Sequence, residues 1–92
     1  MYGTVRRYAG SDLATKLGDR AGDVTEVMGS VSGVRAYYLI QAGGDSISVT
    51  ISDDADSGRA SSEAAARWIR ENAPEIGAPA PEVSAGEVVA SV

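Results

Sequence analysis

Three stretches of the chain alternate between two sets of side chains, as β-strands do. Residues 2–8 alternate loosely, whereas residues 34–42 and 46–52 alternate clearly. The pair Gly43-Gly44 lies between the last two stretches and suits a tight hairpin turn. This turn predicts the register of the hairpin, with residues 36, 38 and 40 opposite residues 51, 49 and 47.

Two other stretches have apolar residues every three or four positions, which is the period of an amphipathic helix. The first, residues 13–31, is predicted as one helix; its three glycines mark either a close-packed face or a break. The second follows the acidic loop 52–58 and ends near Ala73, because Pro74 comes next. The valines of residues 82–92 favour a last strand.

The resulting order β-α-β-β-α-β predicts an α+β, ferredoxin-like fold, in which a four-stranded antiparallel sheet carries two helices on one face. The other face of the sheet is then uncovered. Its predicted side chains are too apolar for solvent and too polar for a dry core, so we expect a second copy of the sheet there, with a partly wet cavity between. This face is predicted to carry Arg35, Tyr37, Leu39, Gln41, Ser48 and Thr50.

Composition is consistent with this picture. The 92 residues suffice for one domain, residues 1–92, and the apolar set includes 15 alanines but no Phe. A core of such small side chains is thin, which also favours a homodimer. The net charge of −5 argues against nucleic-acid or anionic-membrane partners. The absence of Cys and His excludes disulfides, Cys nucleophiles, Ser-His-Asp triads and His-ligated haem within the chain. No targeting or membrane segment is recognisable, so a cytoplasmic location is expected.

Four segments carry a resemblance to a known family: residues 2–8, 33–38, 65–72 and 81–88. Together they resemble the dimeric α+β barrel superfamily, near small bacterial proteins of the antibiotic-biosynthesis-monooxygenase-like group. The resemblance implies a homodimer whose two sheets face each other. It also implies that active members oxidise a phenolic or anthrone-type substrate with O₂ in a cavity between sheet and helices. No metal, flavin or other cofactor is implied.

The resemblance directs attention to three candidate catalytic residues. Trp68 is the only Trp, and Asn72 lies one turn later on the same helix face. In one interpretation, Trp68 is an aromatic platform at a cavity wall and Asn72 donates a hydrogen bond to the substrate. In the other, Trp68 anchors the helix to the sheet and Asn72 caps the end of the helix. Tyr37 either donates its hydroxyl to a substrate oxygen or packs at the interface. Asn72 need not occupy the position of the Asn used by oxidising relatives.

A second set of residues is predicted to bind substrate. Arg7 and Arg35 could orient an enolate or carboxylate, because a guanidinium binds anions well. Alternatively they pair, together with Arg6, with Glu82, Glu87 or acids of the partner subunit. The remaining candidates are the members of the predicted open face: Leu39, Ser48 and Thr50.

The acidic loop Asp53–Gly58 could suggest calcium binding. However, Ala55 and Ala64 occupy positions where an EF-hand needs ligands. We therefore interpret the loop as a helix N-cap.

Three functions stay open from the sequence. The chain is a cofactor-independent, monooxygenase-like enzyme acting on a small aromatic or quinol in a cavity of the dimer, a small-molecule-binding protein without chemistry, or a purely structural homodimer. No residue stands out as a general base.

Overall fold

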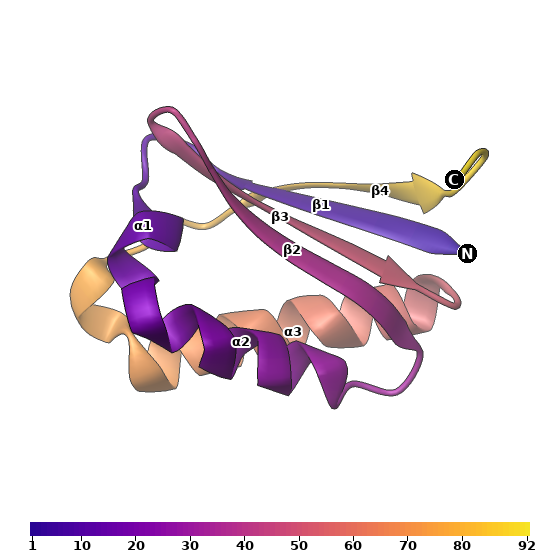
Figure 1. Cartoon of the computed structure of the whole chain (residues 1–92), viewed down its shortest axis with the longest axis horizontal. Coiled ribbons are helices and arrows are strands. Elements are labelled where there is room, and N and C mark those ends of the chain that lie inside the picture. Colours follow the sequence, from indigo (N-terminus) through magenta and orange to yellow (C-terminus); the bar gives the residue numbers. More distant parts are fainter.

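The computed structural model describes all residues, 1–92. One four-stranded sheet lies against a single layer of helices, which cover one of its two faces (Figure 1). Neighbouring strands are antiparallel and follow the order β2-β3-β1-β4, as the ferredoxin-like prediction requires. In chain order the elements are β1 (Tyr2–Tyr8), α1 (Leu13–Leu17), α2 (Ala21–Gly29), β2 (Val34–Ala42), β3 (Asp45–Ser52), α3 (Ala55–Asn72) and β4 (Glu82–Glu87).

The hairpin of β2 and β3 has the predicted register. Tyr38 lies opposite Val49, and Ile40 lies opposite Ile47. Gly43 has a φ of 60°, the left-handed conformation that a tight hairpin turn requires.

The first predicted helix is broken, in contrast to the single helix expected for residues 13–31. It consists of α1, one turn of 3-10 helix at Gly18–Arg20, and α2. Gly18 has a φ of 51°, which an α-helix cannot accommodate, so α1 ends there. The break lets α1 and α2 pack on the sheet in two different directions (Figure 1).

The second predicted helix is confirmed, and so is the interpretation of the acidic loop as its cap. The Asp54 side chain accepts a hydrogen bond of 2.8 Å from the backbone N–H of Ser57 at the start of α3. The helix ends at Asn72, before Pro74. None of the helices combines the length and the apolar character needed to cross a bilayer.

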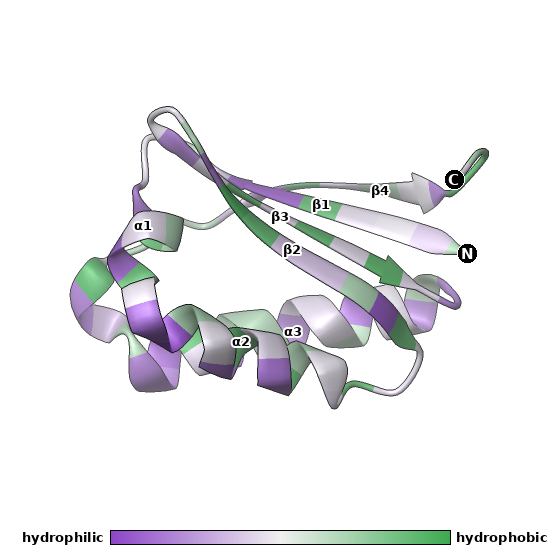
Figure 2. Cartoon of the chain, viewed as in Figure 1, coloured by the Kyte–Doolittle hydropathy of each residue, from purple (hydrophilic) through white to green (hydrophobic).

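The predicted assignment of the two sheet faces is wrong. Tyr37, Leu39, Ser48 and Thr50 lie on the face that the helices cover, and they are buried or half-buried there. The opposite face carries the larger apolar side chains of β2 and β3 and is uncovered. Tyr38 and Ile40 on this open face are 59% and 45% exposed, and Figure 2 shows hydrophobic and polar residues alternating along β3. Further apolar residues of the open face include Val5, Ala36, Ile47, Val49 and Ile51.

Close approach of α3 explains why β3 presents only small polar side chains to the covered face. A Cβ added at Gly58 of α3 would lie only 2.8 Å from Oγ1 of Thr4 on β1. Larger side chains at this contact would push the helix away from the sheet. The apolar core lies instead toward α1 and α2. It contains Tyr8, Leu13, Leu17, Val24, Met28, Ala65, Trp68 and Ala73.

Candidate functional site

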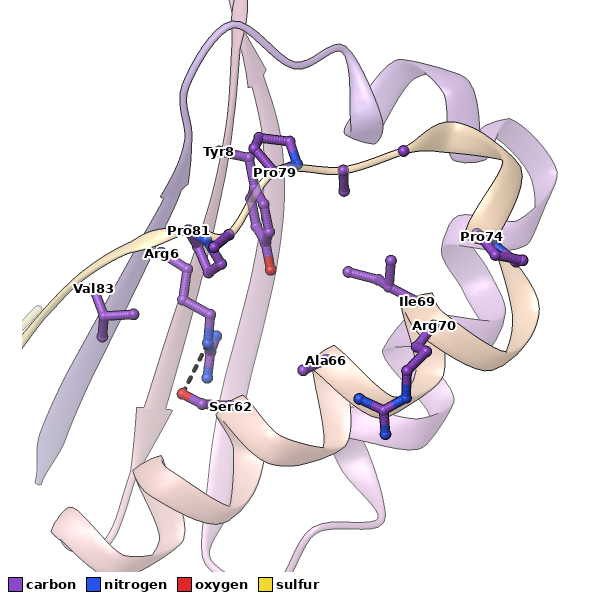
Figure 3. A pocket seen from close by; sticks show the side chains of 14 residues that line it. Arg6, Tyr8, Ser62, Ala66, Ile69, Arg70, Pro74, Pro79, Pro81 and Val83 are labelled. Carbon is purple, nitrogen blue, oxygen red and sulfur yellow. Dashed lines mark hydrogen bonds between the residues drawn. The ribbon is translucent and has the colours of Figure 1, made fainter.

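A cavity of about 460 Å³ lies between β1, α3 and the segment that connects α3 to β4. Its volume falls within the usual range of small-molecule sites. Most of its wall is apolar, and four polar or charged side chains border it. These are Arg6 and Tyr8 of β1 and Ser62 and Arg70 of α3 (Figure 3).

The end of α3 creates the cavity. Ser62, Ala66, Ile69 and Arg70 are spaced so that they share one face of the helix, and this face borders the cavity. Beyond the helix, residues 73–81 contain all three prolines of the chain and cross from α3 to β4. No helix covers β4, whose residues are all exposed. The space between α3 and the edge of the sheet is therefore open to a ligand.

Arg6 is the most unusual group of the cavity, because its charged side chain is only 1% exposed. Four hydroxyls surround its guanidinium. Nε donates to Ser62 Oγ at 2.9 Å, and Nη2 donates to Ser61 Oγ at 2.7 Å. Nη1 donates to Ser48 Oγ at 3.1 Å and to Thr50 Oγ1 at 2.9 Å. This network joins β1, β3 and α3 at the inner end of the cavity.

Burial changes the ionisation of the groups around Arg6. It lowers the pKa of the Arg6 guanidinium, and the phenols of Tyr8 and Tyr37 act in the opposite direction. Burial likewise raises the pKa of Tyr8, and it raises the pKa of Tyr37 to about 12. Both phenols therefore carry their protons at neutral pH and can donate hydrogen bonds.

This geometry can be compared with known proteins. No protein-family model and no curated protein matches the sequence. Solved structures match over nearly the whole chain. A protein of unknown function from Nitrosomonas europaea has a TM-score of 0.76 and 17% identity, with 99% of this chain and 91% of that chain covered. An antibiotic biosynthesis monooxygenase has a TM-score of 0.68 and 13% identity, with 98% and 100% covered.

A mutant of SnoaB, a cofactor-independent oxygenase from Streptomyces nogalater, has a TM-score of 0.67 and 10% identity, with 99% of this chain and 95% of that chain covered. The chain has the fold of the antibiotic biosynthesis monooxygenases. The α+β, ferredoxin-like fold expected from the sequence is thereby confirmed for the single chain. At these identities the likeness concerns the fold, so the site must be argued from this chain's own residues.

Within this monooxygenase fold, two of the predicted catalytic residues lie away from the cavity. Trp68 is 8% exposed and faces α2, where it borders a shallow cleft with Val27. Nδ2 of Asn72 donates to the carbonyl of Trp68 at 3.1 Å, which ties the side chain to the helix end. These placements match the alternative in which Trp68 anchors the core and Asn72 closes the helix.

The predicted residues of β2 and β3 lie behind the cavity. Ser48 and Thr50 hold Arg6, as described above, and so support its position. Tyr37 is close enough to Arg6 and Tyr8 for their charges to affect its pKa. Leu39 packs against the apolar core.

The predicted anion-binding arginines are engaged in exposed ion pairs. Arg7 forms ion pairs with Asp45 at 2.8 Å and with Glu82 at 3.3 Å. The pair with Glu82 matches the alternative interpretation, in which Arg7 pairs with an acidic residue instead of binding substrate. Arg35 pairs with Asp53. Arg6, in contrast, has no acidic partner; the expectation that it pairs with a glutamate is wrong, because its side chain points to the covered face.

The sequence did not predict the four polar side chains of the cavity, which are Arg6, Tyr8, Ser62 and Arg70. One signal was available for the first two. Thr4, Arg6 and Tyr8 share one side of β1 through the period of two, and Arg6 lies opposite Ser48. A charged residue on the same face as a run of serines and threonines indicates a buried polar network. The contribution of α3 depends on packing and has no comparable local signal.

Proposed function

We propose that this chain is a cofactor-independent, monooxygenase-like enzyme that binds a small hydroxyaromatic or quinol substrate in the cavity beside Arg6. One observation carries the proposal: a largely apolar cavity of about 460 Å³ has a guanidinium and a phenol at its inner end. Apolar walls suit aromatic rings, and the two polar groups can donate hydrogen bonds to a ring oxygen. The fold shared with a cofactor-independent oxygenase adds support.

Electron-rich hydroxyaromatic rings can react with O₂ without a cofactor. When a ring methylene becomes a carbonyl, the carbon loses four electrons and O₂ gains four. One oxygen atom becomes the carbonyl oxygen, and the other leaves as water with the two methylene hydrogens. A quinol instead gives up two hydrogens to O₂ and yields a quinone and H₂O₂. Arg6 and Tyr8 would stabilise the negative charge that develops on the ring oxygen.

The same proposal includes a homodimer formed through the open face. Apolar side chains on neighbouring strands form a continuous patch there, with Tyr38 and Ile40 among its most exposed members. Contiguous exposed apolar patches mark interaction sites in proteins of this kind. A second copy of the sheet would cover this patch while leaving the cavity, on the opposite face, free for substrate.

One observation favours a second candidate, a binding protein without chemistry. The residues that line the cavity include no carboxylate that could serve as a general base. The absence of a base is compatible with an enzyme whose substrate loses its proton to solvent. It is equally compatible with a protein that only binds its ligand. Measurement of turnover separates the two candidates.

The experiment is O₂ uptake by the purified protein with anthrone and a set of quinols. Ala66→Trp places a large side chain in the cavity, whereas Ala60→Trp places one on an exposed part of the same helix. We expect uptake above the protein-free rate in the wild type and in Ala60→Trp, and its loss in Ala66→Trp. Equal uptake by the two variants would remove the cavity as the site. Ligand binding without uptake would establish the second candidate.

A further inference from the structure

Positive charge without a partner gathers at the cavity, although the chain as a whole is acidic. Of its 8 basic and 13 acidic residues, none of the acidic ones lines the cavity. Five basic side chains form ion pairs: Arg7, Lys16, Arg20, Arg35 and Arg59. Three form none, and two of these three, Arg6 and Arg70, line the cavity. The third is Arg67.

The hydrogen bonds of Arg6 leave its charge uncompensated. A guanidinium has five N–H donors. Four of them are used, one by Ser62, two by Ser48 and Thr50, and one by Ser61. One N–H of Nη2 remains, and every partner is a neutral hydroxyl. Buried charges are normally paired, because neutral groups replace only part of the lost hydration.

The remaining polar groups of the cavity complete an anion site. The hydroxyl of Tyr8 points into the cavity from the same strand as Arg6 (Figure 3). Arg70 lies across the cavity on α3, where it is exposed to solvent. Charge-assisted hydrogen bonds from a guanidinium are stronger than those between neutral groups. A negatively charged oxygen would therefore gain both a hydrogen-bond partner and an opposite charge at the inner end.

We propose that the cavity takes an aromatic acid in its anionic form, with the anionic oxygen bound by Arg6 and Tyr8 and with Arg70 attracting it at the solvent side. This inference rests on the cavity of the proposed function and names the class of ligand for it. An ionised hydroxyl and a ring carboxylate present the same charged oxygen. The alternative is that Arg6 only fastens α3 to the sheet through the four hydroxyls.

The test compares two probes of nearly equal shape, 2-naphthoate and the neutral 2-naphthamide, by calorimetric titration of the full chain at low ionic strength. We expect 2-naphthoate to bind about tenfold more tightly or better, as a charge-assisted hydrogen bond allows. Arg70→Gln should weaken naphthoate binding about two- to fivefold, which is the scale of an exposed charge. Arg67→Gln is the matched control, since Arg67 is on the same helix and unpaired but outside the cavity.

Arg6→Met and Tyr8→Phe test the inner end, with circular dichroism as the check on folding. Each should reduce the preference for naphthoate and leave naphthamide binding nearly unchanged. If Arg6→Met fails to fold, the inference is still tested by Tyr8→Phe. It is also tested by comparing Arg70→Gln with its control Arg67→Gln. Equal affinity for the two probes overturns the inference, and so does equal weakening by Arg70→Gln and Arg67→Gln.

Oxygen uptake separates this inference from the proposed function. Preference for naphthoate without uptake with any quinol supports the anion site and removes the oxygenase. If O₂ uptake is lost in Ala66→Trp but the protein binds 2-naphthoate and 2-naphthamide equally well, the oxygenase is supported and the anion site is overturned.

Discussion

Nη2 of Arg6 and Oγ of Ser61 lie 2.7 Å apart where β1 meets α3, and both side chains are almost completely buried. This contact connects the two main features of the molecule. Ser61 belongs to the small-residue face by which α3 approaches the sheet, and Arg6 supplies the charge at the inner end of the cavity. The close packing of α3 therefore also determines where the cation lies.

The close approach of α3 predicts a large cost for a small substitution. In Gly58→Ala, the new Cβ would lie 2.8 Å from Oγ1 of Thr4 and 3.1 Å from the ring of Tyr2. Both neighbours belong to β1, so the helix must shift away from the strand. We expect a loss of about 1–3 kcal/mol in the free energy of unfolding, measured by urea denaturation. Gly22→Ala is the control: a Cβ there meets nothing within 4 Å, and the change should stabilise α2 by about 1 kcal/mol. Equal effects of the two substitutions would contradict the packing described here.

The half-buried phenol of Tyr37 predicts a loss of stability at high pH. Burial raises its pKa to about 12, against about 10 in an unfolded chain. As the pH rises from 10 to 12, the unfolded state loses this proton first and is favoured. The free energy of unfolding should fall by at most about 2–3 kcal/mol over that range. Tyr37→Phe should make the fall shallower in denaturation curves recorded at each pH, and an unchanged fall would exclude Tyr37 as a cause.

Local pattern was enough to predict the hairpin register but not the face that the helices cover. The period of two places Ser48 and Thr50 on one face and Ile47 and Val49 on the other. The choice between the faces depends on α3. Its Gly58 and Ser61 accept only small neighbours, and the hydroxyls are satisfied by Arg6, more than 40 residues away in the chain.

The site was predicted less well than the fold for the same reason. Trp68 and Arg35 stand out in the sequence as residue types, yet one lies in the core and the other in an exposed ion pair. The period of two along β1 indicates that Arg6 faces the hydroxyls of β3, but not that it has no carboxylate partner. Whether a buried arginine has a carboxylate partner depends on how distant segments pack together, so no single segment of the sequence shows it.

The open face predicts where a charge should dissociate the proposed homodimer. Ile40→Glu introduces a carboxylate into the apolar patch, where burial against a second copy would strip it of water. Sedimentation should show a dimer for the wild type and a monomer for this variant. Val89→Glu is the control, because Val89 is 96% exposed and lies beyond the sheet, and it should remain a dimer. A dimer that survives Ile40→Glu would show that the copies meet elsewhere.

The positions of Tyr8 and Trp68 predict that substitution of Tyr8 lowers turnover and that substitution of Trp68 does not. Tyr8 borders the cavity, whereas Trp68 faces α2. With a quinol that the wild type oxidises, Tyr8→Phe should lower the rate about tenfold, as the loss of a hydrogen bond to a charged oxygen allows. Trp68→Phe should retain most of the rate while costing stability. The reverse order of rates would return Trp68 to the catalytic role that the sequence suggested.

Whether the ligand binds in the cavity beside Arg6 can be seen in a crystal structure of the full chain with 2-naphthoate. We expect the naphthalene ring to lie among Ala66, Ile69 and Val83. We expect the carboxylate within about 3.2 Å of the Arg6 guanidinium and the Tyr8 hydroxyl. A naphthoate found only on the open sheet face, or only in the cleft beside Trp68, with this cavity empty, would contradict this expectation.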